Sequence, residues 1–163
     1  KRLRRHLRAS QAPRHLPHLA EKILVVIRGK VINIQHTTLE EFVIKELTDT
    51  LSQDDLSLLE GNLARQEEAL LKNDAFAFHE EDRNFHDYFM KVYGNAMITD
   101  FITNLRDRIE GININMLKQP GNMRLFWGEH KKILEALHKR DAEGATREMD
   151  EHLKGGKDRL LRG

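Results

Sequence analysis

The sequence is 163 residues long, which allows one well-buried domain and a small additional module but excludes two full-sized domains. Hydrophobic residues make up 39% and charged residues 33%, so the composition excludes a disordered chain, and the net charge of +1 favours no particular partner. The lack of cysteine excludes disulfides and thiolate metal ligands, and no apolar run approaches the roughly 20 residues of a membrane span, so we expect a cytoplasmic protein without a membrane partner.

The first 20 residues form a basic segment. They contain six lysine and arginine residues and no acidic residue, which leaves 21 basic against 26 acidic residues in the rest of the chain. Charge alone is typical of a solvated tail, although it also suits a module that contacts phosphate groups. Residues 1–8 can form one or two helical turns, and Ser10-Gln11-Ala12-Pro13 has the pattern of a cap followed by a proline early in a second helix.

Two β-branched runs follow, at residues 23–27 and 31–34, separated by Arg28-Gly29-Lys30. Together they predict a β-hairpin with a basic tip. The order of helix, turn, helix and hairpin is that of a winged helix-turn-helix. The same pattern fits a plain hairpin after a basic tail equally well.

From Thr38 onward the hydrophobic periodicity predicts helices. The expected segments are a helix opened by a capping box at Thr38, then Ser52 to about Lys72, Asp74 to Gly94-Asn95, Ala96–Lys118, Arg124–Lys139 and Ala142–Leu161. The predicted fold is mainly α. It is an antiparallel helical bundle over residues 37–163, preceded by an incomplete winged helix-turn-helix with a small β-hairpin wing over residues 1–36.

Four polar side chains are expected to point into this bundle. Asp82 and His86 are one helical turn apart, and His130 and His152 each lie on the apolar stripe of a later helix. A single histidine on an apolar face is more often a hydrogen-bonded core residue than a ligand. Burying all four unpaired would cost about 1 to 3 kcal/mol each, so the set favours one bound divalent metal.

Three imidazoles and a carboxylate suit Zn, Ni, Mn or Fe and leave one or two positions open. An open position can polarise water, as in an enzyme, or receive the carboxylate of a small effector. The metalloprotease helix motif is excluded, because Arg83 stands where a second histidine should follow His79-Glu80.

These residues resemble the FCD effector domain of FadR-type regulators in the GntR family, over most of Thr50–Leu161. The matching pieces are Asp82-x-x-x-His86 with Gly94-Asn95, Glu129-His130-x-x-Ile133-x-x-Ala136-Leu137, Arg140-Asp141-Ala142 and Met149-x-x-His152-Leu153. The resemblance implies that Asp82, His86, His130 and His152 bind one divalent metal ion, with Zn, Ni or Mn as the candidates, and that a small organic acid docks beside it. The front of the chain resembles the family's winged helix.

The function implied is that of a ligand-responsive bacterial transcription regulator, not an enzyme, which binds operator DNA as a homodimer. We expect DNA contacts from Arg8, Ser10, Gln11, Arg14, Arg28 and Lys30, and effector contacts from Arg106, Arg108 and Asn113. The alternative is a metal-dependent hydrolase or lyase, for which Glu81, Asp87 and Glu129 are the nearby acids able to act as a base. A third hypothesis is a structural metal in a DNA-binding protein without an effector.

Overall fold

The computed structural model describes residues 25–27, 30–32 and 35–162. The chain divides into two compact units, residues 1–35 and 36–163. In the first, β1 (Val25–Ile27) pairs antiparallel with β2 (Lys30–Ile32), and Val26 lies opposite Val31. These strands fall in the range predicted for the hairpin. The two helices predicted before it lie outside the described residues, so the winged helix stays a prediction.

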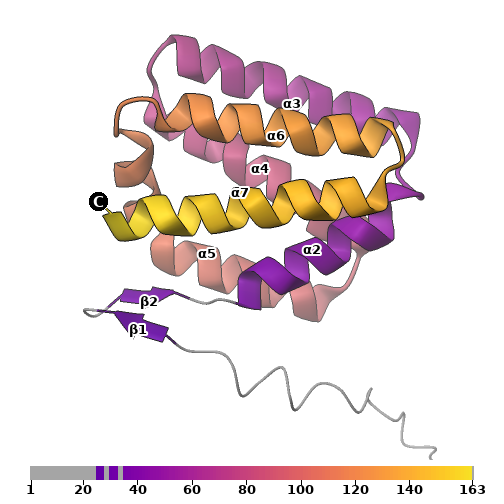
Figure 1. The fold of residues 1–163 in the computed structure, drawn as a ribbon, viewed down its shortest axis with the longest axis horizontal. Helices are drawn as coiled ribbons and strands as arrows, with labels where there is room; N and C mark the ends of the chain where they lie inside the picture. Colours follow the sequence, from indigo (N-terminus) through magenta and orange to yellow (C-terminus); the bar gives the residue numbers. More distant parts are fainter. Residues whose placement is uncertain (1–24, 28–29, 33–34, 163) are drawn as a thin grey trace, which may run out of the picture. The chain divides into compact units, whose positions relative to one another are not determined.

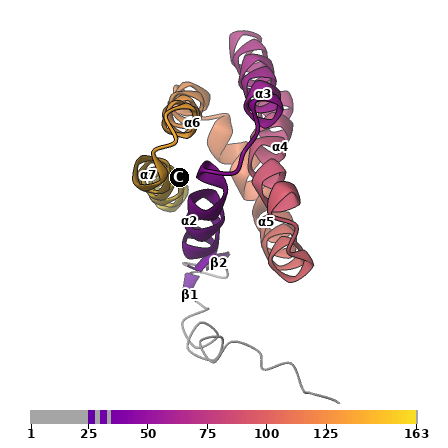
Figure 2. The ribbon, with the colours of Figure 1, turned by 90° about the vertical axis from the view of Figure 1, so that its right-hand side faces the viewer.

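The second unit is built from helices, which confirms the prediction of a mainly α fold. Its elements are α2 (Gln35–Thr48), α3 (Gln53–Leu71), α4 (Ala75–Tyr93), α5 (Ala96–Leu117), α6 (Asn122–His138) and α7 (Ala142–Arg162). In Figure 1 α3, α6 and α7 run side by side. The view turned by 90° places α6 and α7 on one side, α3, α4 and α5 on the other, and α2 between them (Figure 2).

Local sequence signals set several of the helix ends. Ser52 caps α3 through a reciprocal capping box with Asp55, and Asp74 caps α4 by accepting from two backbone N–H groups. The C-cap of α4 is Gly94, whose φ of 72° lies in the left-handed region that glycine adopts without strain. The start predicted at Thr38 is wrong: α2 begins at Gln35, and no glycine or proline lies between Gln35 and Thr38 to interrupt the helix.

The core of the second unit forms two apolar clusters. The larger one joins α2 to the other helices through side chains such as Val43, Ile44 and Phe85, each with no exposed surface. The smaller one surrounds Phe78 and Phe126, near the start of α4 and of α6. Among the described residues of this unit four histidines are buried, and three of them, His86, His130 and His152, set the position of the site described below.

A carboxyl pair joins α2 to α7 and makes stability depend on pH. Partial burial, a hydrogen bond with Asp150 and the charge of Asp150 raise the pKa of Glu41 from 4.5 to about 7, although Lys154 opposes this. Because the folded state holds this proton more tightly, the stability that Glu41 contributes is fully present below pH 4.5 and is lost as the pH rises through about 7. Glutamine does not ionise, so we expect the E41Q variant not to lose this stability. Its free energy of unfolding, relative to that of wild type, should therefore be higher at pH 8 than at pH 5.

Urea unfolding of both proteins at the two pH values measures this difference. The matched control is E46Q, which changes an exposed glutamate of the same helix. An E41Q variant that follows the wild-type pH profile would contradict the assignment.

Candidate metal centre

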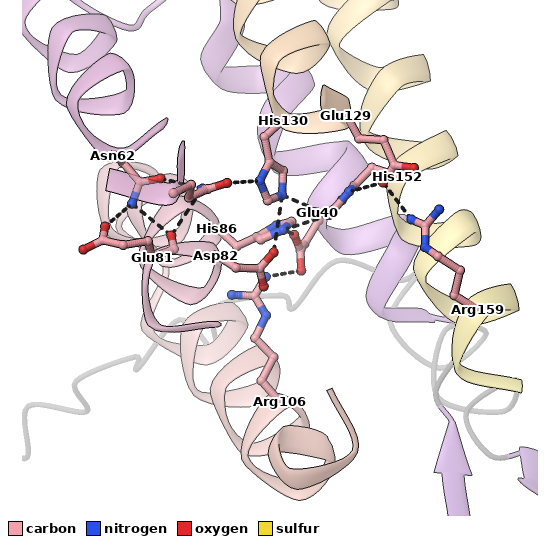
Figure 3. Close-up of polar contacts among 11 residues, drawn as sticks. Glu40, Asn62, Glu81, Asp82, His86, Arg106, Glu129, His130, His152 and Arg159 are labelled. Carbon is pink, nitrogen blue, oxygen red and sulfur yellow. Dashed lines mark hydrogen bonds and ion pairs between the residues drawn. The ribbon is translucent and has the colours of Figure 1, made fainter. Parts of the chain in front are cut away.

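Four side chains from three helices converge inside the bundle (Figure 3). Asp82 and His86 lie one turn apart on α4, His130 lies on α6 and His152 on α7. The three histidines are buried, whereas Asp82 keeps partial exposure. The structure therefore brings together all four residues that the sequence indicated as a set.

The ring nitrogens face one another at short range. His152 Nε2 lies 3.1 Å from His86 Nε2 and 3.2 Å from His130 Nε2. Asp82 Oδ1 lies 3.6 Å from His130 Nε2, and one donor atom from each of the four residues lies within 4.8 Å of the others.

The opposite nitrogen of each ring contacts a hydrogen-bond acceptor. His86 Nδ1 lies 2.6 Å from Glu40 Oε2, His130 Nδ1 2.8 Å from Gln66 Oε1, and His152 Nδ1 3.0 Å from Glu129 Oε2. Carboxylate and amide oxygens only accept, so each ring places its proton on Nδ1 and turns the Nε2 lone pair inward. Three lone pairs at such separations repel one another unless a cation lies between them.

A network on α3 fixes the orientation of the Gln66 amide. Gln66 Nε2 donates to Asn62 Oδ1 at 2.8 Å, and Asn62 Nδ2 donates in turn to the backbone oxygen of Glu81 at 2.9 Å and to its carboxylate at 2.7 Å. Both amide groups therefore have their oxygen and nitrogen atoms assigned by their partners. The Gln66 oxygen must face His130.

Arginines hold the two carboxylates that orient His86 and His152. Arg106 on α5 binds Glu40, whose side chain has no exposed surface, and also binds Asp87 at 2.8 Å. Arg159 on α7 binds Glu129 at 2.7 Å. These partners balance carboxylates that would otherwise be costly to bury.

Burial keeps two of the imidazoles neutral. Desolvation lowers the pKa of His86, and the nearby positive charge of Arg106 adds to this although Glu40 opposes it. Desolvation and the two neighbouring histidines lower the pKa of His130 well below its ordinary value. Burial alone would raise the pKa of Glu129, but its hydrogen bonds from His152 and Arg159 outweigh that and lower it. The site thus offers neutral nitrogen donors and an ionised carboxylate partner, as metal binding requires.

The donor set fits a divalent ion. Nitrogens held about 2.1 Å from one ion lie roughly 3.0 to 3.4 Å apart in octahedral or tetrahedral arrangements. The two Nε2 separations of 3.1 and 3.2 Å fall in that range. Three imidazoles with one carboxylate are ligands that Zn, Ni and Mn accept.

The effector residues predicted on α5 have different surroundings. Arg106 is bound to Glu40 and Asp87 near the cluster, and Asn113 is partly buried on the same helix. Arg108 lies on α5, but its side chain is outside the part that the structure describes. Of the predicted DNA contacts, Lys30 begins β2, while Arg8, Ser10, Gln11, Arg14 and Arg28 lie outside the described residues.

Sequence reasoning missed the residues that orient the ring nitrogens. Glu40, Gln66 and Glu129 contact the three Nδ1 atoms, and none of them is predicted from the sequence as a partner of a histidine. Glu129 had a usable signal, since it stands beside His130 in the matched motif. Glu40 and Gln66 lie 46 and 64 residues from their histidines, and only the folded chain brings them together.

We expect the E40Q variant to bind zinc about 10 to 100 times more weakly than wild type, as is typical when a partner of a ligating histidine is changed. The amide can still fill the space, but it removes the negative charge that faces His86 and Arg106. Isothermal titration with Zn²⁺ measures the affinity. The exposed E46Q change on the same helix is the control, and equal zinc affinity in both variants would contradict a role for Glu40.

The described part of the chain contains no helix long and apolar enough to cross a membrane. The second unit belongs to the class of helical domains, and it carries a cluster of three histidines and one aspartate among its helices. The FCD domain family matches residues 36–155, so the chain belongs to that family. This confirms the resemblance that the spacing of Asp82, His86, His130 and His152 indicated.

Curated relatives of the chain are named as HTH-type transcriptional regulators. The HTH-type transcriptional repressor RspR of Escherichia coli K12 is 25% identical over 111 residues, which cover 68% of this chain and 49% of the repressor. The uncharacterized HTH-type transcriptional regulator YdfH of Shigella flexneri matches to the same extent. The chain thus spans about half the length of these relatives.

Two solved structures share the fold. Escherichia coli McbR/YncC superposes with a TM-score of 0.72 at 17% identity, over 90% of this chain and 81% of that one. A GntR protein of Streptococcus agalactiae superposes with a TM-score of 0.58 at 20% identity, over 85% of this chain and 76% of that one. At these identities the likeness establishes the fold alone.

Proposed function

We propose that this chain is the ligand-sensing part of a transcription regulator of the GntR type, and that Asp82, His86, His130 and His152 hold one divalent metal ion. The metal assignment rests on one observation: the Nε2 atoms of three histidines converge, while Nδ1 of each ring faces a hydrogen-bond acceptor. When bound, the ion supplies a Lewis-acid position for an anionic oxygen.

The charge around this position favours an organic acid as the effector. The outer carboxylates Glu40 and Glu129 are each paired with an arginine. The charge of the inner cluster is then that of a divalent ion and Asp82, which is net positive. A carboxylate entering the open coordination position would be attracted by that charge in a site screened from water.

The DNA-binding role belongs to the first unit in this proposal. It is supported by the names of the relatives, which are HTH-type regulators, and by the basic segment at residues 1–20. The protein would act as a homodimer that places two such units on an inverted repeat. Effector binding would change helix packing around the ion and so the geometry of the two DNA-binding units.

The acidic side chains near the cluster are already bound to other side chains, which argues against a hydrolase or lyase. A general base has to face a metal-bound water, yet Glu81 is held by Asn62 and Arg65. Asp87 binds Arg106 and Arg83. Glu129 binds His152 and Arg159. The regulator is therefore the better supported function.

A two-part experiment tests this proposal. Metal content of the purified protein and titration with Zn²⁺, Ni²⁺ and Mn²⁺ test the site, with one ion per chain expected. Selection of bound fragments from a random duplex library by the full-length protein tests DNA recognition, with an enriched inverted repeat expected. A protein that takes up no divalent ion, or that enriches no sequence, would contradict the corresponding half of the proposal.

A further inference from the structure

We propose that His79 and Arg159 form a second anion subsite beside the metal cluster, which binds the distal carboxylate of a dicarboxylic acid. This inference rests on the proposed function, because the proximal carboxylate of the same ligand would bind the metal ion. It names the effector class as an organic acid with two separated anionic groups.

His79 and Arg159 contain buried polar atoms that have no hydrogen-bond partner in the part of the chain that the structure describes. Within the described residues, the buried side-chain nitrogen and oxygen atoms without a hydrogen-bond partner are Nδ1 and Nε2 of His79 and Nε of Arg159. His79 is only 9% exposed. Buried polar groups in native proteins are almost always paired, so groups left without a partner call for a missing one. All three atoms can donate to an anion when the imidazole is protonated.

The directions of the helices show where His79 and Arg159 lie relative to the metal cluster. Tyr88 contacts Asp55 and Asn62 contacts Glu81, so α3 and α4 run antiparallel. His138 contacts Glu60 and His130 contacts Gln66, which makes α6 antiparallel to α3 as well. α4 and α6 are therefore parallel. α7 returns along α6 after a short connection, as the views show (Figures 1 and 2).

These directions put both residues on the same side of the metal cluster. His79 precedes His86 by seven residues on α4, and Arg159 follows His152 by seven residues on α7. Because α4 and α7 run in opposite directions, the two displacements point the same way, each about 10 Å along its helix axis. A ligand that extends from the ion in that direction would meet both side chains.

Contacts at this end of the bundle support the placement. The Arg159 guanidinium lies 4.3 Å from the centre of the Phe126 ring, and that ring lies 5.4 Å from His152. Phe126 packs in the same apolar cluster as Phe78, the chain neighbour of His79. The Phe126 ring therefore contacts both His152 of the cluster and Arg159 of the subsite, and it offers an aromatic surface to an acid with an apolar middle.

Two glycines of α7 provide the room for Arg159. A Cβ atom at Gly155 would lie 3.1 Å from the guanidinium, and one at Gly156 would lie 3.4 Å from the Phe126 ring. Side chains at these positions would force the arginine or the ring to move. The helix can thus bring Arg159 back toward the cluster, where it binds Glu129 at 2.7 Å.

A glutamate of α5 is the natural competitor for this subsite. Glu110 Oε1 lies 3.8 Å from His79 Nε2, beyond hydrogen-bond distance, and its side chain is 50% exposed. It can turn toward solvent when a ligand carboxylate arrives. Removing its charge should strengthen dicarboxylate binding, since a like charge beside the subsite opposes the ligand.

The test is calorimetric titration of the zinc-loaded full-length protein with acetate, succinate and adipate. Wild type should bind one of the dicarboxylates about tenfold or more tightly than acetate. H79L should reduce this advantage to about twofold or less without changing the zinc or acetate affinity. E110Q should increase it, and H138L, at a histidine on the outer side of α6 that pairs with Glu60, should leave it unchanged.

A second readout separates ligand binding from a structural role. Without ligand, the thermal unfolding of H79L should match or exceed that of wild type, because the leucine buries no unpartnered nitrogen. Retention of the dicarboxylate advantage in H79L, or equal binding of acetate and both dicarboxylates by wild type, would overturn the subsite while leaving the metal site intact. Failure of wild type to bind zinc would overturn the proposed function and the subsite together.

Discussion

Replacing His152 with alanine is expected to abolish metal binding and the stability that it confers. The Nε2 atom of His152 lies 3.1 Å from Nε2 of His86 and 3.2 Å from Nε2 of His130. The alanine variant therefore loses the donor atom that lies near both other imidazole donors. A ligand that binds only the folded state stabilises it by about 2.7 kcal/mol at a hundred times its dissociation constant. Wild type should gain this from zinc, and H152A should gain nothing measurable.

Denaturant unfolding with EDTA and with saturating Zn²⁺ checks this result in both proteins. The matched control is H138A, which removes a partly exposed histidine on α6 paired with Glu60. It should keep the full zinc effect. A zinc-dependent shift in H152A as large as that of wild type would show that the ion binds elsewhere.

The F85A variant is expected to lose about 3 to 5 kcal/mol of folding free energy, the usual cost of emptying a fully buried aromatic site. Phe85 has no exposed surface and stacks on the His130 ring with centroids 4.4 Å apart. Its ring is also roughly perpendicular to the rings of His86 and Phe89, with centroids 5.7 and 5.2 Å away. The cavity would therefore remove the packing that fixes two histidine rings as well as apolar contacts.

Urea unfolding in the presence of EDTA isolates this packing effect from any metal effect. F76A provides the control, since Phe76 on the same helix is 61% exposed and should change the free energy of unfolding little. F85L should fall between the two because it refills much of the volume. A loss below about 1 kcal/mol in F85A would contradict the assignment of Phe85 to the core.

The sequence predicted the elements that local rules determine. Ser52, Asp74 and Gly94 carry the capping chemistry in their own side chains or backbone, so the ends of α3 and α4 could be read directly. The start of α2 could not, because Thr38 satisfies a capping pattern that the longer helix from Gln35 overrides. Local capping energy is small compared with the packing of a whole helix.

The cluster was predictable for a different reason. Asp82 and His86 share a helix face by spacing alone, and His130 and His152 lie on strongly apolar stripes. Their partners were not predictable, since Glu40 and Gln66 reach the histidines from distant parts of the chain. Arg106 shows the same limit, because its ion-pair partners Asp87 and Glu40 lie 19 and 66 residues away in the sequence. Its contact with an effector stays a prediction.

If the cluster holds an ion as proposed, the sequence positions of its members decide when that ion can be captured during synthesis. Glu40 and His86 are 46 residues apart, His86 and His152 are 66 apart, and the arginine that holds Glu129 stands at position 159. A nascent chain therefore lacks a ligand until α7 has left the ribosome and packed against α4 and α6. Metal uptake would then follow the packing of α7 against the other helices, and chains truncated before α7 would lack the His152 donor.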